Sequence, residues 1–213
     1  MSIDSLSTPL HQAVKILREG PDGLYYALLY QGGIACFDKG NEKFLPVRFD
    51  KTLKLKDVLD FYWNGGNLYL TTSQGLFESR VVRKTEGEND FVLCILNPEP
   101  LVRGKVAHLC SDGKTNLYFS VNQGKVMHYD LVTKTASLIK EYSVVNRLFL
   151  RHGYLWICRL WDDIICYDLK TNEERVISME GKDQSEFSNS YVTDLVLKDN
   201  RTFYLTTWNG LYK

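Results

Sequence analysis

Short apolar runs separated by polar, turn-forming stretches fill the chain, and one of these runs occurs five times. It is a triplet with tyrosine or tryptophan in the middle position. The five copies are Tyr25-Tyr26-Ala27, Leu68-Tyr69-Leu70, Leu117-Tyr118-Phe119, Leu155-Trp156-Ile157 and Phe203-Tyr204-Leu205. Runs this short, bounded by Gly, Asn and Asp, are typical of β-strands, and no helical periodicity of comparable strength accompanies them. The pattern predicts an all-β chain.

Two further positions keep a fixed spacing from each triplet. A Val-x-x-apolar pattern precedes it by 10 or 11 residues, beginning at Val14, Val58, Val106, Val145 and Val192. A turn follows it, with glycine at Gly32, Gly75, Gly124 and Gly210 and aspartate at Asp162 in the fourth copy. Because glycine permits the positive φ of a tight hairpin, we expect the triplet strand to end there.

Each repeat contains four expected strands: Val-x-x-apolar, the triplet, a third such as 34–37, and a weaker fourth such as 43–49. Four short strands in about 40 to 50 residues are typical of a β-propeller blade. We predict a single domain, 1–213, that forms a five-bladed β-propeller of four-stranded antiparallel blades. The blades are about 11–50, 55–97, 103–141, 143–180 and 190–213 plus 1–8. The N-terminal strand would complete the last blade and close the ring.

The triplet aromatics should pack between neighbouring blades, because one blade cannot bury both of its faces alone. Residues 191–213 (YVTDLVLKDNRTFYLTTWNGLYK) and 67–78 (NLYLTTSQGLFE) resemble the two-component-regulator propeller repeat. That repeat has Asn-x-Val, a polar turn, an aromatic, a short strand ending in Thr, and Gly-Leu-Tyr. The fourth copy departs most from it, with Trp161-Asp162-Asp163 in place of the Gln-Gly turn. The resemblance implies propeller blades. It also implies extracytoplasmic ligand detection coupled to a membrane span and a kinase, but nothing in the sequence matches those parts, so we carry over only the blade architecture.

Charge and cysteine content limit the possible partners and the expected cellular location. The 26 basic and 26 acidic residues cancel, which argues against a nucleic-acid or anionic-membrane partner. The sequence has no run of about 20 apolar residues that would span a bilayer, and no secretion signal at its start. Its five cysteines form no CxxC pair and lie in apolar runs, as expected of buried thiols in a reducing compartment. These features predict a cytoplasmic location.

The turns after the triplets and the loops entering the first strands should share one rim, the expected binding surface. Its expected binding residues are Gln31, Gln74, Gln123, Arg103, Arg159, Trp161, Asp162, Trp208, Asn209 and Tyr191. Aromatic faces beside amides and arginine suit a protein, a peptide or a sugar. The alternative is that the amides serve turn geometry, that the tryptophans cap the core, and that Arg159 pairs with Asp162 or Asp163.

Catalysis has weaker support. The four histidines form no i, i+4 pair, so we predict no metal and no cofactor. Asp60, His108, Arg147 and Asp194 each stand two residues after a repeat valine and would line the channel, either as acid and base groups of a glycosidase or as a satisfied polar ring. Our preferred hypothesis is a non-catalytic binding scaffold that presents the rim to a protein or peptide. The alternatives are a carbohydrate-binding, lectin-like propeller and a small glycoside hydrolase acting at the central channel.

Overall fold

The computed structural model describes residues 13–40, 42–49, 57–83, 91–160, 162–177, 192–198, 202–207 and 210–212. Within these ranges the regular elements are all β-strands, which confirms the all-β prediction. No helix in this part of the chain is long and apolar enough to cross a membrane. Two compact units, 1–107 and 108–213, make up the chain, and each is described by itself.

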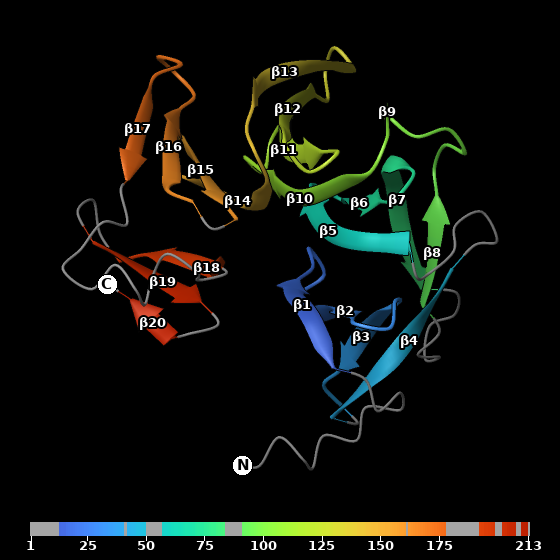
Figure 1. Ribbon diagram of the computed structural model, residues 1–213. Coiled ribbons are helices and arrows are strands. Elements are labelled where there is room, and N and C mark those ends of the chain that lie inside the picture. Colours follow the sequence, from blue (N-terminus) through green and yellow to red (C-terminus); the bar gives the residue numbers. More distant parts are fainter. Residues whose placement is uncertain are drawn as a thin grey trace. The chain divides into compact units, whose positions relative to one another are not determined.

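The first unit contains one nine-stranded sheet (Figure 1). Its strands are β1 (Val14–Glu19), β2 (Tyr25–Leu29), β3 (Ile34–Asp38), β4 (Lys43–Phe49), β5 (Val58–Asn64), β6 (Asn67–Thr72), β7 (Gly75–Arg83), β8 (Phe91–Ile95) and β9 (Val102–Arg103). The order is β1-β2-β3-β4-β8-β7-β6-β5, and β9 pairs with β7. Each of the first two repeats thus supplies four antiparallel strands, as expected.

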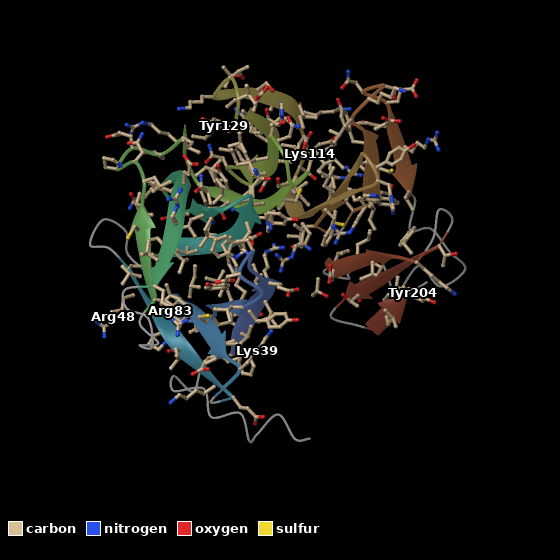
Figure 2. The ribbon with its side chains drawn as sticks, turned by 180° about the vertical axis from the view of Figure 1, so that it is seen from behind. Lys39, Arg48, Arg83, Lys114, Tyr129 and Tyr204 are labelled. Carbon is tan, nitrogen blue, oxygen red and sulfur yellow. The ribbon has the colours of Figure 1, made fainter. Side chains whose placement is uncertain are left out.

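The four-stranded groups of these two repeats are joined into one sheet, because their outermost strands pair with each other. β4 and β8 run parallel, with Val47 opposite Phe91 and Phe49 opposite Leu93. Arg83 of β7 lies beside this junction, its guanidinium 5.8 Å from the Phe91 ring centroid (Figure 2). Each strand satisfies the backbone edge that the other would expose. Hydrophobic periodicity does not predict such a pairing, since it reports which face is buried but not which edge is free.

The second unit contains three sheets, and its boundary with the first falls within β10. The first two are four-stranded: β10 (Val106–Ser111), β11 (Asn116–Val121), β12 (Lys125–Asp130) and β13 (Thr135–Glu141), then β14 (Val145–Arg151), β15 (Tyr154–Arg159), β16 (Ile164–Asp168) and β17 (Glu174–Ile177). The third has β18 (Val192–Leu197), β19 (Phe203–Thr207) and β20 (Gly210–Tyr212). The closing strand expected at 1–8 lies outside the described residues. Ring closure, the count of five blades and the single domain therefore stay predictions.

Two of the triplet aromatics, Tyr26 and Trp156, lie between consecutive repeats, as expected. In the first unit Tyr26 is buried and its ring lies 5.2 Å from that of Trp63 on β5. In the second unit Trp156 packs against Phe203 of β19, with 5.5 Å between ring centroids. The cluster around Tyr26 joins apolar residues of the first two repeats, and the cluster around Trp156 joins those of the last two. In these two pairs, each repeat therefore completes its core with its neighbour.

The Val-x-x-apolar pattern marks a β-bulge. In β1, β5, β14 and β18 the pairing register shifts between the valine and the second residue after it. In β5 the shift falls between Val58 and Asp60, and the Thr71 hydroxyl donates to the Asp60 carbonyl at 3.3 Å. In β18 the Thr206 hydroxyl bonds the Asp194 carbonyl at 3.4 Å. A bulge at the same point of four first strands bends each strand and re-aims its side chains.

Candidate binding surface

The turns between second and third strands carry the predicted amides. Gln31, Gln74 and Gln123 are exposed in the β2–β3, β6–β7 and β11–β12 turns, and Asp162 is exposed in the β15–β16 turn. The backbone of Gln123 itself adopts a positive φ of 73°. These side chains project from short turns on three sheets.

The glycines of these turns serve two purposes, only one of which we expected. Gly32 has a φ of 92°, as a tight hairpin requires. Gly75 and Gly124 lack a positive φ and are glycines because another chain segment lies against them. A Cβ on Gly75 would lie 2.4 Å from the Val102 carbonyl oxygen, and one on Gly124 would lie 2.5 Å from the Tyr142 carbonyl oxygen. In both repeats the contacting segment is the connection that leads to the next repeat.

Backbone hydrogen bonds hold these connections against the turns. The Gly104 N–H donates to the Gln74 carbonyl at 3.2 Å, and the Val145 N–H donates to the Gln123 carbonyl at 2.6 Å. The Thr72 hydroxyl adds a local clamp, donating to the Gly75 carbonyl and accepting the Gln74 N–H at 3.0 Å. The main chain of these two turns is therefore fixed, and their glutamine side chains remain exposed.

The two arginines of the predicted site have acidic partners within the chain. Arg103, exposed on β9, pairs with Glu99. Arg159 lies 2.6 Å from the Asp162 carboxylate, and its Nε donates to the Asp163 carbonyl at 3.2 Å. The structure therefore adopts the alternative that we gave for Arg159, in which it pairs with neighbouring aspartates. The exposed glutamines of these turns, by contrast, carry no formal charge.

The structure brings together two parts of the predicted site: Gln74 with the Arg103–Gly104 connection, and Arg159 with Asp162. Four predicted residues lie outside the described part of the chain: Trp161, Tyr191, Trp208 and Asn209. The site as a whole stays a prediction.

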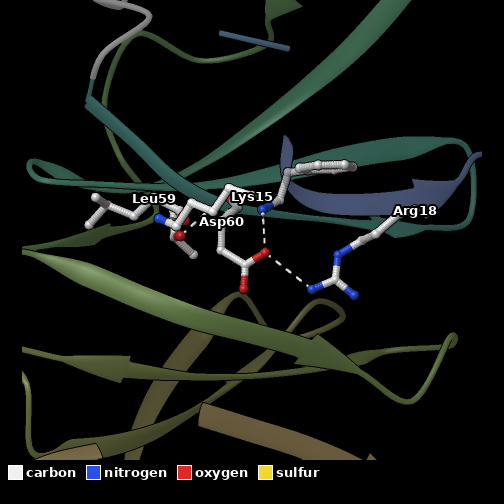
Figure 3. Close-up of polar contacts among 6 residues, drawn as sticks. Lys15, Arg18, Leu59 and Asp60 are labelled. Atoms are coloured by element: carbon white, nitrogen blue, oxygen red, sulfur yellow. Dashed lines mark hydrogen bonds and ion pairs between the residues drawn. The ribbon is translucent and has the colours of Figure 1, made fainter. Parts of the chain in front are cut away.

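Asp60 is one of the four polar residues that stand two positions after a repeat valine, and its side chain is bound within the fold. This carboxylate is buried and accepts the Phe61 N–H at 2.7 Å and Arg18 Nη2 at 3.1 Å (Figure 3). Asp194, in the other unit, accepts the Leu195 N–H at 2.8 Å. Among the described residues no three His, Cys, Asp or Glu side chains gather as metal ligands.

Two residues that link neighbouring repeats at the bulges were not predicted from the sequence. Lys15 Nζ donates to the Leu59 carbonyl at 2.9 Å (Figure 3). Asn146, buried in β14, donates through Nδ2 to the Val192 carbonyl at 2.8 Å. Both immediately follow a repeat valine, and a polar residue at that position was the available signal.

The cysteines are all free. Burial raises the pKa of the Cys36 thiol and of the Cys158 thiol to about 12 in each case. A proton is therefore held on each sulfur at neutral pH, so these two thiols behave as small apolar groups.

Comparison with known proteins finds likeness in structure alone. No protein-family model matches the chain, and no curated protein matches it. The extracellular domain of a B. thetaiotaomicron protein described as a one-component system superimposes with a TM-score of 0.72 at 15% identity, over 93% of this chain and 28% of that one. A second extracellular domain from that organism, of a protein described as a hybrid two-component system, gives a TM-score of 0.64 at 14% identity over 99% of this chain and 29% of that one. An auxiliary nutrient-binding protein of the same organism gives 0.55 at 15% identity, over 94% and 56%.

These comparisons support a propeller-like all-β fold, and the chain spans less than a third of the two sensor domains. They also overturn one prediction. The cytoplasmic location inferred from the sequence is wrong, because both sensor structures that superimpose on nearly the whole chain are extracellular domains. The physical reason is that buried, protonated thiols such as Cys36 pack as apolar groups in either compartment and so do not report its redox state.

Proposed function

We propose that this protein is a non-catalytic binding module that acts outside the cytoplasm and recognises a protein or peptide through the rim of second-to-third-strand turns. The observation that carries the proposal is the fixed backbone of the β6–β7 and β11–β12 turns. Each is held by a connection lying against Gly75 or Gly124, and each exposes one glutamine. A fixed backbone removes the entropic cost of ordering the turn on binding, and the amides can pair with the main chain of an extended peptide.

The solved structures support a binding role outside the cytoplasm. The same fold serves as the extracellular domain of sensor proteins and as a nutrient-binding protein. Carbohydrate binding is the second candidate, favoured by the neutral character of the exposed glutamines beside arginines that already have acidic partners.

The experiment compares two double variants with the wild type on a phage-displayed peptide library and on a glycan array. Gln74→Ala with Gln123→Ala alters the rim. Thr133→Ala with Thr171→Ala is the matched control, because both threonines are exposed on third-to-fourth-strand turns of the second unit. Circular dichroism melting establishes that both variants remain folded.

We expect selected peptides to bind the rim variant about five- to thirtyfold more weakly, since truncating two contacting residues at about 0.5–1 kcal/mol each has that effect. The control should bind like the wild type. Glycan binding that depends on the same two glutamines would replace the peptide proposal with the second candidate. Ligands that bind all three proteins equally would contradict the assignment of the rim.

A further inference from the structure

A hollow of about 310 Å³ lies in the first unit, lined by Arg18, Glu19, Tyr62 and Trp63. Glu19 is the last residue of β1, and Tyr62 and Trp63 lie near the end of β5. The turn that carries Gln31 adjoins the opposite end of β1, where the Tyr30 N–H donates to the Ala13 carbonyl at 3.0 Å. The hollow is therefore distinct from the rim.

Arg18 forms part of the wall and is held in place. Its Nη2 lies 3.1 Å from the Asp60 carboxylate (Figure 3), and its guanidinium lies 4.8 Å from the Tyr62 ring centroid. The carboxylate offsets the charge, and the ring fixes the plane of the guanidinium. The charge of Arg18 is thus offset within the fold, although its buried Nε has no hydrogen-bond partner among the described residues.

The hollow has one acidic lining residue, Glu19. Glu19 is exposed and forms no ion pair with any residue in the described part of the chain. Asp22, on the turn that follows β1, accepts the Tyr26 hydroxyl at 2.7 Å. Asp60 is paired with Arg18, so Glu19 supplies the accessible negative charge among the residues that line the hollow.

The aromatic residues complete a site for an amphipathic cation. Tyr62 and Trp63 are half-buried, so each presents part of its ring surface. A basic side chain buries its methylene groups on such surfaces while its charged head stays near solvent. The volume lies at the lower end of the about 300–1,000 Å³ typical of ligand pockets, which suits one side chain rather than a larger ligand.

We infer that this hollow receives an arginine or lysine side chain of a peptide partner, with the charged head at Glu19 and the methylene groups against Tyr62 and Trp63. The inference rests on the peptide partner proposed above but concerns a separate contact, at the other end of the strands from the rim. A partner that carries a basic residue would engage both places.

The test titrates the protein with acetyl-Gly-Arg-Gly-amide and follows the indole N–H resonance of Trp63, assigned by its loss in Trp63→Phe. That N–H is buried and has no hydrogen-bond partner among the described residues, so small changes in its surroundings should move its chemical shift. The matched probe is the same peptide with citrulline, which keeps the shape of arginine without the charge. Glu42→Gln is the matched control for Glu19→Gln, because Glu42 is also exposed but lies in the β3–β4 turn.

We expect the arginine peptide to give a saturating shift in the wild type. The Kd should rise about twofold to fivefold in Glu19→Gln, the range for a solvent-exposed ion pair, and stay unchanged in Glu42→Gln. Equal binding of the citrulline peptide, no effect of Glu19→Gln, or displacement of the peptide by neutral sugars would overturn the inference. The double variant Gln74→Ala with Gln123→Ala should leave the titration unaltered. Failure of the rim proposal and failure of this inference would therefore be distinguishable.

Discussion

Replacing Gly75 with alanine tests whether the connection to the third repeat fixes the rim. The added Cβ would lie 2.4 Å from the Val102 carbonyl oxygen and 2.6 Å from Pro100 Cβ. The carbonyl belongs to the main chain of β9, which pairs with β7 at this point, so it cannot rotate away as a flexible side chain would. The substitution should force β9 off the turn.

Gly66→Ala provides the matched control. Gly66 lies in the turn between β5 and β6, has no positive φ, and a Cβ there would meet no atom of the described residues within 4 Å. Overpacking costs about 1–3 kcal/mol, whereas a tolerated Gly→Ala change stabilises by about 0.4–1 kcal/mol through the unfolded chain. The free energies of unfolding of the two variants should therefore differ by about 1.4–4 kcal/mol.

Urea unfolding followed by far-UV circular dichroism measures this difference. In thermal melts, each kcal/mol corresponds to about 2–4 °C for a domain of this size. If Gly75→Ala and Gly66→Ala unfold at the same urea concentration, the β9 connection does not constrain the turn, and the structural basis of the proposed rim fails.

Two further predictions concern buried polar groups. Asp60→Ala removes the acceptor of both Arg18 and the Phe61 N–H and should destabilise the protein by about 1–3 kcal/mol in urea unfolding, with a smaller loss for Asp60→Asn; unchanged stability of Asp60→Ala would refute it. The Cys36 thiol ionises with a pKa of about 12 when folded against 9.0 ordinarily, so the unfolded chain binds fewer protons above pH 9 and stability should fall as pH rises from about 9 toward 12. A urea midpoint that is the same at pH 8 and pH 10.5 would contradict this.

Local signals predicted much of the fold. The triplet marked the second strand of each repeat because a short apolar run bounded by turn-forming residues is specified by neighbouring residues alone. The repeat valines also occupy equivalent positions in the structure, where four of them begin a bulge such as that between Val58 and Asp60. The bulge could not be predicted, because it depends on pairing between strands. The β4–β8 pairing was not predicted, since it joins strand edges that are distant in sequence and carry no distinguishing side-chain pattern.

The candidate site was predictable in part for the same reason. Exposed Gln74 and Gln123 could be placed because turn chemistry is local. The contact that makes Gly75 obligatory could not, because Val102 reaches it from the following connection. The hollow at Glu19 and Trp63 also escaped prediction, since it forms only where the ends of two repeats meet.

The parallel pairing of β4 with β8 has a consequence for how this protein can change over evolution. A repeat that contacts its neighbours only face to face can be duplicated, deleted or exchanged singly, and repeat arrays grow in this way. Here the first two repeats share a continuous ladder of backbone hydrogen bonds, so losing either one would strip a strand edge from the other and leave it open to aggregation. The first two repeats should therefore be inherited, and should tolerate engineering, only as a pair.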